Sequence, residues 1–253
     1  MGRPSARTGG SGDGAAWLFA PAMPPEGGTH WLTRDEARHA TGSRRLHAGD
    51  AVTLFDGKGS TARATLGDAR RDDGALEVHV GSVRHEPRQG RHVTVASAIP
   101  KGDRLATMME GIGPLGVAEF MPLHAERGVV PWSAHLQQRC GRILVECAKQ
   151  SRSPWVTAIP SVEGREAIAV VREGRARGAQ VLIADRDGAP LAPRASSIDP
   201  AQGVVVLIGP EGGFSARERD DAVAAGAVPV SLGPAILRIE LAATVAAALL
   251  RLG

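Results

Sequence analysis

Hydrophobic positions in the first third of the chain recur in short segments separated by turn residues. Residues 51–55 (AVTLF) end at 56–59 (DGKG), a sequence typical of a hairpin turn, and residues 61–66 (TARATL) follow as the partner strand. Residues 76–80 (LEVHV) alternate apolar and polar positions with a period of two. We therefore predict a small β-rich unit over residues 16–88, built as a barrel, after a Gly-, Ser- and Arg-rich flexible tail at residues 1–15.

Beyond residue 91 the pattern changes to apolar runs that alternate with helical periodicity. Residues 181–184 (VLIA) and 204–208 (VVVLI) are continuous apolar runs, as strands buried on both faces require. Strands that alternate with helices predict an α/β unit with a mostly parallel sheet over residues 89–253. The remaining predicted strands are residues 93–99, 117–123, 156–159 and 228–232.

Capping residues mark where the predicted helices of this second unit begin. Asp103 and Ser133 each precede a segment with apolar residues at helical spacing, and either side chain is able to cap a helix. Apolar spacing at Ile168 and Val171 predicts a further helix, and residues 239–252 form the last one.

The first segment with candidate chemistry is a glycine-rich turn, residues 208–215 (IGPEGGFS), between a predicted strand and a helix. Ser215 and Glu218 have the Ser-x-x-Glu spacing of a capping box, which fixes the start of that helix. The glycines leave main-chain N–H groups accessible, and loops after parallel strands are where open α/β sheets bind ligands. The segment matches neither the P-loop nor the dinucleotide-binding glycine pattern. A plain strand-to-helix turn stays the alternative.

A second such segment, residues 231–240 (SLGPAILRIE), also leaves a strand and enters a helix. Ile236 and Leu237 place apolar side chains in a loop, where they either cover an adenine ring or plug the core. Glu240 suits a helix N-terminus, whereas the positive charge of Arg238 is unfavourable there. We therefore expect Arg238 to have a carboxylate or phosphate partner.

The charge balance fits an RNA partner without requiring one. The formal net charge is +3, with a pI of about 9.4. Only three of the 30 basic residues are lysines. Arginine binds phosphate in a bidentate manner, although a GC-rich coding bias explains the excess equally well. Aromatic residues make up 3% of the chain and Tyr is absent, so a broad stacking platform for bases is not expected.

The two cysteines argue against a disulfide or a metal site. Cys140 and Cys147 lie in one helical pattern, about 10 Å apart, which is too far for a bridge. No metal-ligand spacing is present, so we expect no metal. Cysteines without a bridge suit the reducing cytoplasm, where we expect the chain to act. We expect no membrane partner, because no apolar run approaches a membrane span and no signal-peptide core is found.

Together the two chemical segments resemble the signature of the bacterial 16S ribosomal RNA (uridine-N3) methyltransferases, a family within the SPOUT (trefoil-knot) methyltransferase superfamily. Weaker matches occur in the right order along nearly the whole chain. Residues 45–50 and 55–59 resemble the family's PUA-like barrel, residues 101–104 and 115–117 its first catalytic strand-helix-strand, and residues 146–151 (ECAKQS) a helix end.

The resemblance implies a fold, a cofactor and a substrate. A PUA-like RNA-binding β-barrel would precede an α/β trefoil-knot (SPOUT) domain, and the chain would act as a homodimer. It would use S-adenosyl-L-methionine to methylate N3 of a uridine in the 16S rRNA of the small ribosomal subunit. The implied cofactor-binding residues are Ile208, Gly209, Pro210, Glu211, Gly212, Gly213, Ser231, Leu232, Gly233, Ile236 and Leu237.

The expected chemistry is in-line methyl transfer without a covalent step, because the cofactor loops contain no His or Cys. Arg238 would stabilise the developing uridine oxyanion or hold a phosphate, as the first of two candidate catalytic residues. Glu240, the second, or Glu211 would orient Arg238 or assist removal of the N3 proton, with a structural role as the alternative for each. The candidate RNA contacts are Arg45, Lys149 and Arg152, with ordinary solvated surface as the alternative.

The sequence also departs from the family pattern. Gly111, Pro114 and Ala235 replace the usual Lys, Glu and Arg, and Ile239 and Leu241 replace two usual Thr. These changes leave the cofactor loops largely intact and affect the predicted RNA contacts. Two alternatives stay open: a methyltransferase of this fold that acts on another RNA position, and an RNA-binding paralogue without catalysis. Binding of S-adenosylmethionine separates them.

Overall fold

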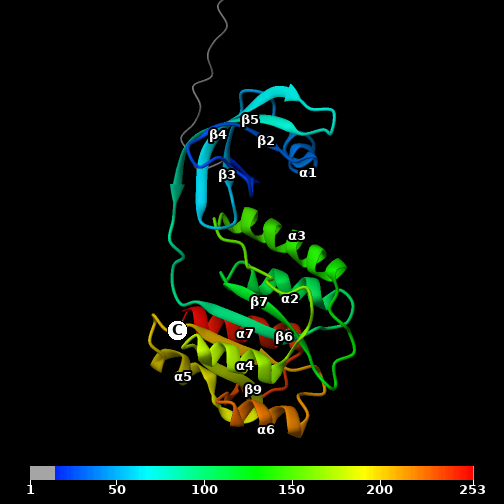
Figure 1. Cartoon of the computed structure of the whole chain (residues 1–253), viewed down its shortest axis with the longest axis vertical. Helices are drawn as coiled ribbons and strands as arrows, with labels where there is room; N and C mark the ends of the chain where they lie inside the picture. The colour runs from blue at the N-terminus through cyan, green and yellow to red at the C-terminus, as the bar shows by residue number, and fades with distance from the viewer. Residues whose placement is uncertain (1–14, 253) are drawn as a thin grey trace, which may run out of the picture. The chain divides into compact units, whose positions relative to one another are not determined.

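A computed structural model describes residues 15–252 of the chain. The predicted tail therefore lies outside the described residues, apart from Ala15. The described residues divide into two compact units, residues 15–86 and 87–252, shown in Figure 1.

The first unit is built on a five-stranded sheet with the order β1-β3-β4-β5-β2. β1 and β3 are parallel, and the other neighbours are antiparallel. A short helix α1 and a π-helical turn η1 follow β2. The elements are β1 (Ala16–Phe19), β2 (Gly28–Leu32), α1 (Arg34–Arg38), η1 (His39–Ser43), β3 (Ala51–Phe55), β4 (Ser60–Arg70) and β5 (Leu76–His85).

The predicted hairpin of this unit is confirmed. β3 and β4 pair with Phe55 opposite Thr61. The Asp56 carboxylate closes the turn, because it accepts hydrogen bonds from the main-chain N–H groups of Lys58 at 2.7 Å and Ser60 at 2.9 Å. The strand predicted at residues 76–80 forms the first half of β5. The strand pairs found in residues 15–252 do not join β1 to β2, so closure of the barrel stays a prediction.

The second unit contains a six-stranded sheet, and every neighbouring pair of its strands is parallel, with the order β11-β9-β10-β6-β7-β8. The strands are β6 (Val93–Ala98), β7 (Glu119–His124), β8 (Arg165–Glu166), β9 (Gln180–Pro190), β10 (Val204–Ile208) and β11 (Val228–Ser231). The helices are α2 (Arg104–Ile112), α3 (Ala134–Ser151), α4 (Ala167–Ala176), α5 (Leu191–Ser197), α6 (Ala216–Ala224) and α7 (Ile239–Leu252).

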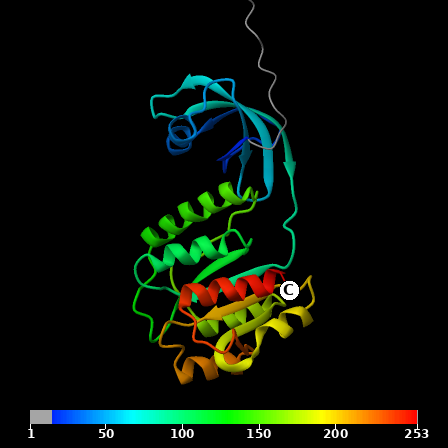
Figure 2. The same ribbon diagram turned by 180° about the vertical axis from the view of Figure 1, so that it is seen from behind.

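Helices cover both faces of this sheet. Alternate residues of one strand point to opposite faces, so Val206 packs in the core beneath α2, α5 and α7, while Leu207 packs beneath α4 and α6. Figure 1 shows α4 in front of the sheet, and Figure 2 brings α7 to the front. Apolar runs such as β10 are therefore buried on both sides, as their composition predicts.

Two of the predicted caps are confirmed and one is wrong. The Ser133 hydroxyl accepts a hydrogen bond from Leu136 N at 3.3 Å, and the capping box at the start of α6 is complete. Asp103 lies before α2, but its side chain makes no capping bond. Its backbone is already helical, and its carboxylate accepts a hydrogen bond from Arg139 Nη2 at 3.1 Å instead.

The strand predicted at residues 156–159 is also wrong. Ala158 alone forms a bridge, to Glu119 at the start of β7. The flanking Val156 and Ile159 side chains pack against the core from an irregular segment. Their apolar character therefore reflects burial without strand pairing.

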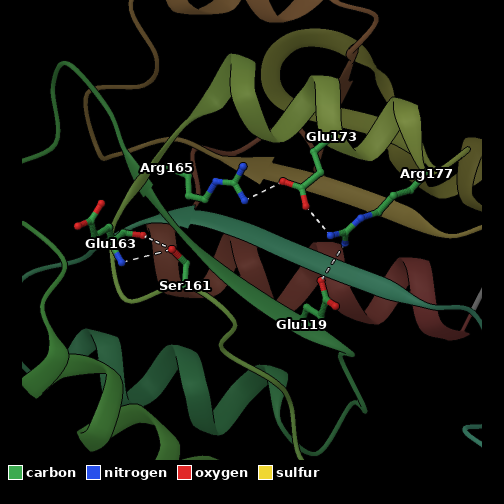
Figure 3. A network of polar contacts seen from close by, with 6 residues as sticks. All are labelled: Glu119, Ser161, Glu163, Arg165, Glu173 and Arg177. Carbon is green, nitrogen blue, oxygen red and sulfur yellow. Dashed lines mark hydrogen bonds and ion pairs between the residues drawn. The ribbon is translucent and has the colours of Figure 1, made fainter.

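An ion-pair network fixes α4 to the edge of the sheet (Figure 3). The Glu173 carboxylate of α4 lies 2.7 Å from Arg165 Nη1 of β8 and also pairs with Arg177. Arg177 in turn lies 3.8 Å from Glu119 of β7. These side chains are partly exposed, so each pair adds little stability alone.

Disulfides, metal-binding clusters and membrane-spanning helices are features that the sequence does not predict for residues 15–252. The buried Cys140 and Cys147 are free thiols. No group of three or more His, Cys, Asp or Glu side chains there is arranged to hold a metal ion. None of the helices in this part of the chain combines the length and apolarity of a membrane span.

Candidate cofactor pocket

A pocket lies at the carboxyl ends of β9, β10 and β11, the edge of a parallel sheet where ligands usually bind. It brings together the two segments that the sequence singled out. All the predicted cofactor-binding residues line it except Gly212. The lining residues are Ala184, Asp185, Arg186, Ile208, Gly209, Pro210, Glu211, Gly213, Ser231, Leu232, Gly233, Ala235, Ile236, Leu237, Ile239 and Ala242.

The glycine-rich turn forms one wall of this pocket. Gly213 N donates a hydrogen bond to Pro210 O at 2.8 Å, which closes a tight turn directly after β10. The Glu211 carboxylate lies 2.7 Å from Arg104 Nη1 at the start of α2. Gly212 stands outside the lining, and its carbonyl accepts a hydrogen bond from Arg127.

The segment after β11 forms the opposite wall. Ser231 Oγ donates to Gly233 O at 3.2 Å and fixes the bend that leaves the strand. Ile236 is 82% exposed, so it does not plug the core. Leu237 is half-buried and packs against the core. Exposed apolar surface beside main-chain polar groups suits a planar, heterocyclic ligand.

The end of β9 forms a third wall, which the sequence pattern did not predict. The predicted strand stops at Ala184, but β9 continues to Pro190, and Asp185 and Arg186 line the pocket. The Asp185 carboxylate is hydrogen-bonded to Arg219 of α6 and to Asp187 N at 2.9 Å. The Arg219 hydrogen bond, more than any other contact, holds the pKa of Asp185 below its usual value.

The two predicted catalytic residues lie where α7 begins. Arg238 is exposed and forms no side-chain hydrogen bond or ion pair with residues 15–252, so the protein partner expected for it is not found there. Glu240 is 9% exposed, and its Oε2 atom is shielded from solvent without a hydrogen-bond partner in the same part of the chain. Glu211 is engaged by Arg104 and does not orient Arg238.

The candidate RNA contacts differ in accessibility. Arg45 and Arg152 are exposed, and both have left-handed backbone conformations, with φ of 54° and 52°. Lys149 is buried, and its ammonium nitrogen lies 2.8 Å from Glu146 Oε1. An RNA phosphate would have to displace that carboxylate. The predicted RNA contact and its alternative, solvated surface, both require an accessible ammonium group, whereas Lys149 is buried.

The departures from the family pattern fall into two groups. A Cβ atom at Gly111 of α2 would lie 2.2 Å from Thr244 Oγ1 of α7, so this glycine permits close helix packing. Ala235 and Ile239 line the pocket itself. Pro114 is exposed, and Leu241 is 49% exposed.

The fold and the site together define a class of protein. Its members have a small β domain followed by a parallel α/β domain with a pocket at the carboxyl ends of the strands. Residues 87–251 match the model of the RNA methyltransferase domain, and residues 32–78 match that of the RNA methyltransferase PUA domain. The chain belongs to this RNA methyltransferase family, and the predicted fold class, PUA-like unit plus SPOUT methyltransferase domain, is confirmed.

Individual relatives are similar to this chain over nearly its full length. The chain is 32% identical over 239 residues to the ribosomal RNA small subunit methyltransferase E of Mycobacterium bovis, covering 92% of this chain and 89% of the relative. Its structure is similar to that of a Neisseria gonorrhoeae ribosomal RNA small subunit methyltransferase E bound to S-adenosyl methionine. The TM-score is 0.80 at 26% identity, with 93% and 96% of the two chains covered. A Legionella pneumophila putative methyltransferase with bound SAM gives the same TM-score and identity, with 94% and 97% covered.

Proposed function

We propose that this protein is an S-adenosylmethionine-dependent methyltransferase that methylates N3 of one uridine in the 16S rRNA of the small ribosomal subunit. The observation that carries the proposal is the convergence of residues 208–213 and 231–237 on one pocket, with the exposed Arg238 next in sequence. The similarity to small-subunit rRNA methyltransferases supports both the cofactor and the substrate class.

The pocket fits the proposed cofactor. Main-chain groups of the glycine-rich turn would read the polar edge of the adenine, and Ile236 and Leu237 would cover its ring. When bound, the cofactor supplies an activated methyl group on a sulfonium sulfur. The protein's own task is then to orient the acceptor base and to exclude water.

Arg238 would stabilise the negative charge that develops on the uridine, and Glu240 would assist removal of its N3 proton. As N3 loses its proton, negative charge spreads to the neighbouring carbonyl oxygens, and the free Arg238 guanidinium would stabilise it there. The Glu240 carboxylate has an unpartnered, shielded oxygen in the described structure, which is available to accept a hydrogen bond or a proton. Arg45 and Arg152 are the proposed contacts to the RNA backbone.

The test uses purified protein, labelled S-adenosylmethionine and small ribosomal subunits that lack the modification, with the methylated nucleotide mapped by mass spectrometry. We expect one uridine with an N3 methyl group. Replacement of Arg238 by Ala should lower kcat about 100-fold, the usual effect of removing a donor from an oxyanion site, without changing Tm. Arg217→Ala is the matched control, because Arg217 is an exposed arginine outside the pocket.

Two outcomes would redirect the proposal. Methylation at another nucleotide would retain the cofactor and replace the substrate. Absence of both transfer and cofactor binding would favour an RNA-binding paralogue, for which the departures Ala235 and Ile239 within the pocket are the specific motive.

We also propose that the protein is a homodimer. Ile236 at the pocket and Leu241 on α7 expose apolar side chains close together in sequence, and a second subunit would bury them. Light scattering after gel filtration should give twice the chain mass, and Leu241→Asp should shift it toward the monomer.

A further inference from the structure

The glycine-rich turn is held from outside by two arginines, one at the start of α2 and one in the loop after β7. Arg104 follows β6 and lies 2.7 Å from Glu211 Oε1 through its Nη1 atom. Arg127 follows β7, and its Nη1 donates to Gly212 O at 2.7 Å. Because β10, β6 and β7 are adjacent parallel strands, the segments that follow their carboxyl ends lie close together.

A third contact joins the same two regions. The Glu218 carboxylate accepts one hydrogen bond from Ser215 N and another from Glu126 N, each at 2.8 Å. Glu218 therefore connects the end of the glycine-rich turn to the residue beside Arg127. The turn is tied to the β7 loop at both its middle and its end.

The turn has few means of holding itself in place. Pro210 is buried, but Gly212 and Gly213 have no side chains and are exposed. Glycine-rich backbone has more conformations to lose than any other, so its order depends on contacts from outside. The ion pair between Arg104 and Glu211 is partly exposed, with 33% and 41% of the side chains accessible, so it adds little to global stability. Its consequence is local order of the turn.

We propose that Arg104 and Arg127 are positioning residues, which hold the Gly209–Gly213 turn in its cofactor-binding conformation. Glu211 then serves as the acceptor for Arg104 and takes no part in removing the uridine proton. This inference rests on the proposed function for its cofactor. Without the clamp, only a fraction of molecules would present the turn correctly, and the apparent Kd would rise by the inverse of that fraction.

The experiment compares Arg104→Glu, Glu211→Arg and the double variant that carries both. Three quantities are measured in each: hydrogen exchange of the residue 209–215 amides without ligand, Kd for S-adenosylmethionine by calorimetry, and Tm. Arg139→Gln is the matched control, since Arg139 pairs with Asp103 at the start of α2 but does not contact the turn. Arg127→Gln and Arg127→Lys test the second contact.

We expect each single charge reversal to speed exchange of the turn and to raise Kd about three- to tenfold, with little change in Tm. The double variant should restore both quantities, because it rebuilds the ion pair with opposite polarity. Arg127→Gln should act like the single reversals, and Arg127→Lys should recover part of the loss. A double variant as weak as Glu211→Arg, or exchange of the turn unchanged from the control, would overturn the proposal.

The hydrogen-exchange readout keeps this test separate from the proposed function. If the wild-type protein bound no S-adenosylmethionine, the proposed function would fail, while exchange of the turn would still decide whether the arginines hold it. If the wild-type protein bound the cofactor and the variants exchanged like the control, only the clamp would fail.

Discussion

Replacement of Gly111 by Ala tests whether the most conspicuous departure from the family pattern is a packing adjustment. The added Cβ would lie 2.2 Å from Thr244 Oγ1 and 3.2 Å from Thr244 Cβ, so rotation of the threonine cannot remove the whole clash. Overpacking of this kind costs about 1–3 kcal/mol, and alanine regains about 1 kcal/mol of helix propensity. Rotation would also break the hydrogen bond from Thr244 Oγ1 to Glu240 O, 2.9 Å long, at about 1 kcal/mol.

The propensity gain and the lost hydrogen bond offset each other, so the net expectation is a loss of about 1–3 kcal/mol from the free energy of unfolding. In a Thr244→Ala background the clashing Oγ1 and Cγ2 atoms are gone, so Gly111→Ala should become neutral or stabilising by up to about 1 kcal/mol. Urea unfolding of the four proteins of this double-mutant cycle measures the coupling directly. An equal loss in both backgrounds would refute the packing explanation.

Three further predictions concern single groups. Burial raises the pKa of Cys140 to about 11, so its thiol should resist alkylation at pH 8 in the native protein and react only after unfolding. Because the pKa of Asp185 is lowered in the folded state, its ionised carboxylate stabilises the fold at pH values above the ordinary carboxyl pKa. This stabilisation is lost as pH falls through the folded-state pKa. The Tm of the wild-type protein should therefore exceed that of Asp185→Asn by less on acidification. The buried Arg91 donates to three main-chain carbonyls near the ends of α5 and α7. Arg91→Met should cost about 2–3 kcal/mol in denaturant unfolding, since it leaves buried acceptors unpaired.

The fold was predictable in segments where the local sequence pattern and the burial of the side chains in the structure favour the same element. The continuous apolar run of β10 and the capping box before α6 each specify an element without reference to the rest of the chain. The same holds for the hairpin at Asp56, where the turn carries its own hydrogen-bond acceptor. Consistency between these levels is what allows a sequence to be interpreted in this way.

The wrong predictions concern segments whose structure depends on contacts with residues far away in the sequence. β9 continues past its apolar run because β11 pairs with it beyond a bulge, with Val230 opposite Ala189. Gly188 permits this close approach, since a Cβ there would lie 2.5 Å from Val230 N. No local pattern predicts such pairing, and Asp185 was therefore not recognised as part of the pocket. Asp103 fails as a cap for a similar reason, because a distant arginine takes its carboxylate.

The departures from the family pattern do not all bear on activity in the same way. The absence of a side chain at Gly111 is matched by Thr244 on the facing helix, so it concerns how α2 packs on α7. Ile239 lines the pocket but is 3% exposed and belongs to the core, so its apolar character stabilises the start of α7. Ala235 differs from both, because it is exposed on the pocket wall and leaves space where the family usually places a positive charge. We expect that a missing arginine at such a position would remove a contact to substrate phosphate or base and would leave the glycine-rich turn and its two arginines unaltered. We therefore expect these departures to alter an RNA contact while cofactor binding is retained.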